Sequence, residues 1–128
     1  MTTKSEDIPS DVRRFILTSI ASVPHMEALV LVCADPEQRW TAPELAKRLY
    51  ITPASAAVVL DDLRQSAIVA FDPANDTFFF ESNPGNGLVQ RAAALYASHL
   101  VEISLLIHSK LDRKAQQFAD AFNFRRDA

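Results

Sequence analysis

The stretch that decides the fold runs from Thr41 to Val69 and reads TAPELAKRLYITPASAAVVLDDLRQSAIV. Its first four residues form a capping box, because the Thr41 hydroxyl is placed to accept from the third amide of a helix while Glu44 reaches back to the Thr41 amide. This pattern predicts a short helix that ends at Leu49 or Tyr50.

A second helix is predicted within the same stretch, after a tight turn at Ile51. Thr52 supplies the cap, and Pro53 occupies the first helical position, where its missing N–H group is not needed. Apolar residues then recur at helical spacing and predict one buried face. The members of that face are Ala56, Val59, Leu60 and Leu63.

Two short strands are predicted next, at residues 68–71 and 77–81. The segment between them contains Pro, Asn and Asp, which favour a hairpin turn. The consecutive phenylalanines 78–80 place rings on both faces of the hairpin, so one face needs cover from another element or another subunit. Trp40 is expected to pack beside the hairpin as an extended segment, and the alternative is an exposed anchor for another molecule.

Before this stretch the sequence predicts two helices. Residues 1–9 are polar and are expected to form a flexible lead-in. Ser10 is placed to cap the first helix, and Ser22 is placed to cap a second one at about residues 24–34. The second helix is apolar on almost every side, so it is expected at the centre of the domain.

After the hairpin the sequence predicts one long helix, residues 88–110, and then a basic and aromatic tail, residues 111–128. The apolar stripe of this helix favours a homodimer, and the alternative is that the helix folds back on the first two helices. In the tail, Phe118 and Phe122 lie one helical turn apart, which suits docking in a groove of this chain or of a partner. The expected dimer or partner surface consists of Leu95, Leu100, Ile103, Ile107, Phe118 and Phe122.

In this order the elements predict a mainly α-helical fold with a small β-hairpin, a winged helix-turn-helix domain over residues 10–110 with a long C-terminal helix. The Glu-Leu-Ala helix, the Thr-Pro turn and the leucine pair before the hairpin resemble the core of the MarR-type bacterial transcriptional regulators. The motifs cover residues 41–81. The resemblance implies that the helix over residues 52–65 enters the major groove of DNA, that the hairpin is the wing and that the terminal helices form a homodimer. Tyr50 stands where glycine is usual in the turn.

The surface that the resemblance assigns to DNA is poor in cations. Residues 39–82 contain four basic and six acidic side chains, which is a net charge of −2. Bases are recognised by Arg, Asn and Gln side chains, and phosphates are held by cations, so this composition argues for weak DNA binding. By position, the expected DNA-facing residues are Thr52, Ala54, Ser55, Ala57, Val58 and Arg64.

The composition argues against several other functions. The chain has 128 residues, is 48% hydrophobic and carries a net charge of −3, which suits one globular domain and does not suit a protein that coats nucleic acid non-specifically. Its single cysteine, Cys33, excludes an internal disulfide and fits the cytoplasm, and no apolar run is long enough to cross a membrane. We find no nucleophile motif, phosphate loop or metal-ligand spacing, so neither an enzyme nor a bound cofactor or metal is expected.

Two functions remain from the sequence. The first is a dimeric protein-interaction module in which the DNA-reading face of a regulator has been reused or lost. The second is a sequence-specific transcriptional regulator that contacts DNA through Thr52, Ser55, Arg64 and the basic tail of its mate. The acidic reading surface favours the first.

Overall fold

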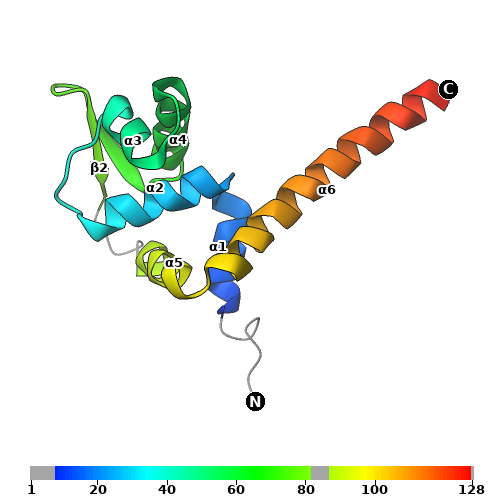
Figure 1. Cartoon of the computed structure of the whole chain (residues 1–128), viewed down its shortest axis with the longest axis horizontal. Helices are drawn as coiled ribbons and strands as arrows, with labels where there is room; N and C mark the ends of the chain where they lie inside the picture. Colours follow the sequence, from blue (N-terminus) through cyan, green and yellow to red (C-terminus); the bar gives the residue numbers. More distant parts are fainter. Residues whose placement is uncertain (1–7, 82–86, 128) are drawn as a thin grey trace, which may run out of the picture.

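The fold is a helical body with one hairpin, from which the last helix extends (Figure 1). The computed structural model describes residues 8–81 and 87–127, and within α6 it describes side chains up to Lys110 and at Gln116, Gln117 and Ala119. Over these residues the elements are α1 (Ser10–Ser19), α2 (Val23–Ala34), α3 (Ala42–Leu49), α4 (Pro53–Gln65), β1 (Val69–Asp72), β2 (Thr77–Phe80), α5 (Gly87–Ser98) and α6 (Leu100–Asp127).

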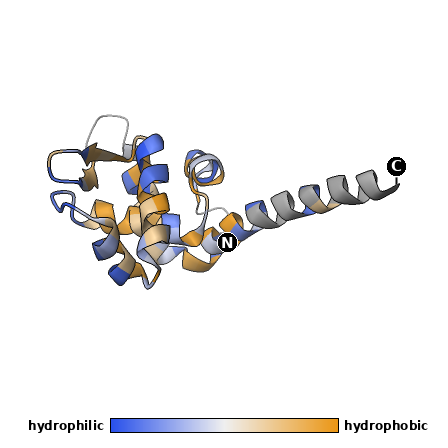
Figure 2. Cartoon of the chain, turned by 90° about the horizontal axis from the view of Figure 1, so that it is seen from above, coloured by the Kyte–Doolittle hydropathy of each residue, from blue (hydrophilic) through white to orange (hydrophobic). Residues whose placement is uncertain are grey.

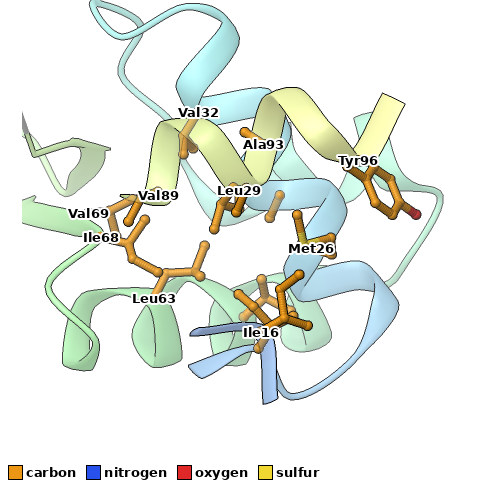
Figure 3. Close-up of a cluster of buried hydrophobic side chains, with 14 of the residues drawn as sticks. Ile16, Met26, Leu29, Val32, Leu63, Ile68, Val69, Val89, Ala93 and Tyr96 are labelled. Carbon is orange, nitrogen blue, oxygen red and sulfur yellow. The ribbon is translucent and has the colours of Figure 1, made fainter. Parts of the chain in front are cut away.

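Helix α2 lies at the centre of the body, as its apolar sequence predicts. It packs against α3, α4, α5 and β2. Met26 and Leu29 of α2 are fully buried and lie among side chains from α1, α4, β1 and α5 (Figure 3). The hydrophobic segments of the body gather toward this centre (Figure 2). The mainly α-helical winged-helix fold expected from the sequence is confirmed.

The predicted helix caps are mostly present. The Thr41 hydroxyl accepts from the Glu44 amide at 3.3 Å, and the Glu44 carboxylate accepts from the Thr41 amide at 3.0 Å, which completes the capping box. The Ser22 hydroxyl caps α2 by accepting from the His25 amide at 3.4 Å. The prediction for Ser10 is wrong, because α1 begins at Ser10 itself and has no side-chain cap.

The hairpin is antiparallel and pairs Val69 with Phe80 and Asp72 with Thr77. Trp40 adds a short extended segment beside it, because the backbone groups of Trp40 and Phe78 exchange two hydrogen bonds of 2.8 Å each. The Trp40 side chain is buried, so its expected packing beside the hairpin is confirmed.

The single helix predicted over residues 88–110 is wrong. The chain forms two helices there, and α5 meets the first part of α6 at a bend of 113°. Just before the bend, the Ser98 hydroxyl donates to the Leu95 carbonyl at 3.2 Å, a local bond that competes with regular helix formation. Because of the bend, the buried apolar residues of both helices face the core. Helix α5 packs on α1 and α2, and α6 packs on α1.

The predicted end of the last helix at Lys110 is also wrong. Helix α6 continues to Asp127, and no glycine or proline occurs after Lys110 to stop it. Lys110 itself anchors α6 to α1, because its Nζ donates to the carbonyls of Leu17 at 2.9 Å and Ile20 at 2.7 Å. The expected lead-in lies largely outside the described residues, and its residue Ile8 is buried in the core.

Among the described residues, no single helix has the length and apolar character needed to cross a membrane. Two pairs of consecutive helices meet those criteria only when each pair is taken together, α1 with α2 and α5 with the first part of α6, and the members of each pair meet at a sharp bend.

Candidate nucleic-acid interface

The outward face of α4 carries the residues that the sequence assigns to DNA. Five of the six expected residues lie together on its first two turns, where their side chains are exposed to solvent, and Arg64 is exposed on the last turn. Val58 is the largest apolar member of this face and is 58% exposed. The five residues of the first two turns are Thr52, Ala54, Ser55, Ala57 and Val58.

The two hydroxyl groups on this face are already used within the helix. The Thr52 Oγ1 accepts from the Ser55 amide at 3.1 Å, so it serves as the helix cap. The same hydroxyl donates to the Ser55 Oγ at 3.0 Å. Contact with a base edge or a phosphate would therefore compete with bonds that hold the first turn of α4.

The polar side chains at the other end of α4 are held by one carboxylate. Asp61 Oδ1 accepts from Arg64 Nε at 3.0 Å and from Arg64 Nη2 at 2.8 Å, and Asp61 Oδ2 accepts from Gln65 Nε2 at 2.8 Å. The Arg64 hydrogen bond lowers the pKa of the Asp61 carboxyl, and the Gln65 bond adds to this. Asp61 is therefore a stable negative charge that neutralises the one arginine of this helix.

The tip of the wing is acidic and is also internally bonded. Asp72 accepts from the Ala74 amide at 3.0 Å and from Asn75 Nδ2 at 2.8 Å. The Asn75 bond is the main reason that the pKa of Asp72 is lowered. Arg39 lies 3.6 Å from the Asp72 carboxylate, and its guanidinium group stacks 4.1 Å from the centre of the Phe79 ring. The cation nearest to the wing thus covers an aromatic face and balances the Asp72 charge.

The exposed rings of the hairpin are partly covered within the chain. Phe80 is buried, whereas Phe79 lies under Arg39 and Phe78 stacks on Phe71 with ring centres 4.9 Å apart. The sequence predicted that the three phenylalanines would need cover, and these neighbours provide it. Phe71 is the hairpin ring that remains substantially exposed.

Sequence reasoning missed a polar link between α2 and α4. His25 Nδ1 lies 2.6 Å from the Ser22 hydroxyl, and His25 Nε2 lies 2.8 Å from Asp62 Oδ2. The residues are of the types found in hydrolase triads, but Ser22 also caps α2, and His25 is buried. These three residues therefore link α2 to α4. The only sequence clue to this link was His25 next to a helix cap, since Asp62 is 37 residues away.

The residues of the expected partner surface differ in their exposure. Leu95 is half-buried and Leu100 is exposed. Ile103 and Ile107 are fully buried within the same chain, because the bend after α5 turns them onto α1, so they do not lie on a partner surface. Phe118 and Phe122 fall in the part of α6 whose side chains lie outside the described residues.

Two apolar residues that the sequence analysis did not select are exposed on α6. Val101 is 65% exposed and Leu105 is 61% exposed, and they lie one helical turn apart. The sequence analysis placed the apolar stripe of this helix on Ile103 and Ile107. Val101 and Leu105 form a second apolar strip, which faces solvent.

The fold of the chain is similar to that of a MarR family protein of known structure. Neither a protein-family model nor a curated protein matches its sequence. A MarR family protein of Mycobacterium tuberculosis is similar in structure with a TM-score of 0.53 and 18% identity, over 93% of this chain and 87% of that chain. This similarity confirms, for the fold, the resemblance that residues 41–81 predict.

Two further structures are similar with lower scores. One is MepR, a transcription regulator of a Staphylococcus aureus multidrug efflux pump, with a TM-score of 0.49 and 13% identity over 96% of this chain and 91% of that chain. The other is the adhesin competence repressor of Streptococcus pyogenes, with a TM-score of 0.48 and 17% identity over 98% of this chain and 96% of that chain.

Proposed function

We propose that the protein is a non-enzymatic, dimeric protein-interaction module built on the winged-helix fold of transcriptional regulators, with a weakened DNA-reading face. The proposal rests mainly on the hydrogen bonds of the Asp61 carboxylate, which accepts from both Arg64 and Gln65 on α4, the helix that would read DNA. A regulator that reads DNA needs such side chains for bases and phosphates.

Charge balance supports the same conclusion. Binding to DNA gains free energy when cations replace counterions along the phosphates. Arg64 is paired with Asp61, and Arg39 is paired with Asp72. To contact a phosphate, either arginine would have to leave its carboxylate, which would then lie near the phosphates without a partner cation. The free energy gained from an arginine–phosphate contact is offset by the loss of the ion pair and by repulsion between the carboxylate and the phosphates.

Lys47 and Arg48 do not change this balance. They lie together near the end of α3, where both are exposed, and Arg48 is 5.5 Å from the centre of the Trp40 ring. Several phosphate contacts are typical of a tight DNA complex. Two adjacent cations on α3 do not supply that number.

Self-association is the second part of the proposal. Leu100, Val101 and Leu105 are exposed apolar residues on α6, the helix that extends from the body (Figure 1). Contiguous exposed apolar residues mark surfaces that another molecule covers. A second copy of the chain is the partner proposed for this strip, and the dimer would act in the cytoplasm without a cofactor.

The alternative function is sequence-specific DNA binding, and the fold shared with the M. tuberculosis MarR family protein favours it. In that case the exposed residues Thr52, Ser55 and Arg64 would contact DNA together with the basic tail of the mate. This function requires the internal bonds of α4 to open upon binding.

Selection of duplexes from a random-sequence pool separates the two functions. The purified full-length chain is incubated with the pool at low salt, and bound duplexes are amplified through several rounds. We expect no motif to be enriched over a matched pool without protein. Enrichment of one motif, particularly a palindrome with half-sites one helical turn apart, would establish the alternative instead.

A further inference from the structure

Tyr50 has an unusual backbone and an unusual exposure for an aromatic residue. It ends α3 with φ 58° and ψ 45°, the left-handed conformation, and its amide donates to the Ala46 carbonyl. Glycine adopts this cap conformation without steric cost, whereas other residues pay about 1–2 kcal/mol. The Tyr50 side chain is 95% exposed, so it returns no burial energy within the chain.

A groove opens beside Tyr50 between α2, α3 and α5. It has a volume of about 330 Å³ and is lined by Val30, Leu31, Leu49 and Tyr96, with Glu27 and Arg48 as its charged residues. The Tyr96 ring packs on the body at this side of α5 (Figure 3). The groove thus combines apolar and aromatic walls with one carboxylate and one guanidinium group.

We infer that this groove, with Tyr50 as one wall, receives the aromatic end of α6, residues 118–126, from a second copy of the chain. The inference rests on the proposed self-association and states where the tail of each copy binds. It assigns Tyr50 a role between chains, which explains an aromatic residue at a position where glycine folds at lower cost.

The path of α6 supports an occupant from another copy. Lys110 fixes α6 to α1, and the following 17 residues of the helix, 111–127, lead away from the body for about 26 Å (Figure 1). A helix on this path does not return to the groove of its own chain. Its end is therefore placed to reach a neighbouring molecule.

The residues of the tail match the groove in chemistry. Residues 118–126 read FADAFNFRR, which combines three phenylalanines with one acidic and two basic residues. Phe118 and Phe122 are one helical turn apart and suit the apolar walls. By helical spacing, positions 125 and 126 share a face with positions 118 and 122, so the positive charge of Arg125 and Arg126 complements Glu27 of the groove.

Photo-crosslinking in the full-length protein tests this placement. The photoreactive aromatic amino acid p-benzoylphenylalanine replaces Tyr50, which keeps a ring at this position, and the variant is mixed with an equal amount of ¹⁵N-labelled wild type. We expect the crosslink to join position 50 to a labelled tryptic peptide, residues 115–125, because trypsin cleaves after Lys114 and Arg125. The label proves that the peptide comes from the other copy.

The same amino acid at Val58 and at Phe71 provides matched controls, because both positions are exposed but lie outside the groove and outside the proposed dimer strip. Neither control is expected to capture the tail peptide to more than about a tenth of the yield at position 50. A higher yield from Phe71 or from Val58 would overturn the inference and place the tail on the hairpin or on the exposed face of α4. Capture of an unlabelled tail peptide alone would overturn it as well.

A pair of glycine variants excludes misfolding as an explanation. Ala67 also has a positive φ, of 62°, and is exposed, so Tyr50→Gly and Ala67→Gly relieve the same backbone strain. We expect Tyr50→Gly to weaken dimerisation about tenfold in sedimentation equilibrium, and Ala67→Gly to leave it unchanged. Equal dimerisation of both variants would contradict the inference while the proposed dimer stands. A wild type that remains monomeric at about 100 µM would overturn both.

Discussion

His25 and Asp62 join the start of α2 to α4, with His25 Nε2 2.8 Å from Asp62 Oδ2 and the histidine only 8% exposed. Asp62→Leu leaves a buried imidazole N–H without an acceptor, which costs about 1–3 kcal/mol of unfolding free energy. Urea denaturation followed by the fluorescence of Trp40, the single tryptophan, measures this cost. Glu37→Leu changes an exposed carboxylate in the same way and is expected to stay within about 0.5 kcal/mol of wild type. Equal effects of the two variants would show that the His25 link does not stabilise the fold.

Two of the three non-glycine residues with positive φ in the described part of the chain, Tyr50 and Ala67, predict a gain in stability upon substitution by glycine. Tyr50→Gly and Ala67→Gly each remove a backbone strain and each add flexibility to the unfolded chain, so the net gain is about 1 kcal/mol or less. In urea denaturation at a protein concentration low enough to keep the chain monomeric, the midpoint is expected to rise for both. A fall in the midpoint for Tyr50→Gly alone would mean that its ring stabilises a single chain, against the 95% exposure of the side chain.

Cys33 is expected to react slowly with alkylating reagents. Burial raises the pKa of its thiol from 9.0 to about 11, and the thiolate is the reactive form. At pH 8 iodoacetamide should therefore modify the folded chain about 100-fold more slowly than the urea-unfolded chain. Since the unfolded thiol ionises first, the unfolding free energy should fall as the pH rises from about 9 to about 11. Equal alkylation rates in the folded and unfolded states would contradict the burial of Cys33.

The last helix predicts opposite results for two neighbouring substitutions. Ile103 is fully buried, so Ile103→Glu is expected to unfold the chain, whereas Leu105→Glu is expected to keep the helical circular dichroism spectrum and abolish the dimer. Circular dichroism and multi-angle light scattering distinguish these effects. A folded, fully dimeric Leu105→Glu variant would show that the outward strip of α6 is not the dimer surface.

Local patterns in the sequence were sufficient for most of the helices and the hairpin. The capping box of Thr41 and Glu44 and the Thr52 cap involve residues within three positions of each other, so the sequence records them directly. The bend near His99 was not predictable from periodicity, because the apolar stripe continues through it without a break. The two helices that it separates pack against α1 and α2, which are far away in the sequence.

The exposure of the expected α4 residues was predictable from the sequence, whereas their hydrogen bonds were less so. The helical spacing placed the expected α4 residues on one exposed face, and Asp61 and Arg64 are close enough in sequence to expect their ion pair. The pairs Arg39–Asp72 and His25–Asp62 depend on the tertiary fold, and the only sign of them in the sequence was the position of His25 next to a helix cap. The exposure of Leu105 and the burial of Ile103 depend on the bend after α5.

The affinity of the wild-type chain for duplex DNA, measured by fluorescence anisotropy at several salt concentrations, tests the central claim most directly. Asp61→Ala, which releases Arg64 and Gln65, and Glu37→Ala, which removes an exposed carboxylate elsewhere, are measured beside it. We expect wild-type binding weaker than roughly 100 µM at about 50 mM salt, a gain of about fivefold for Asp61→Ala and little change for Glu37→Ala. Micromolar or tighter binding by the wild type, with a salt dependence equivalent to several phosphate contacts, would contradict the weakened reading face.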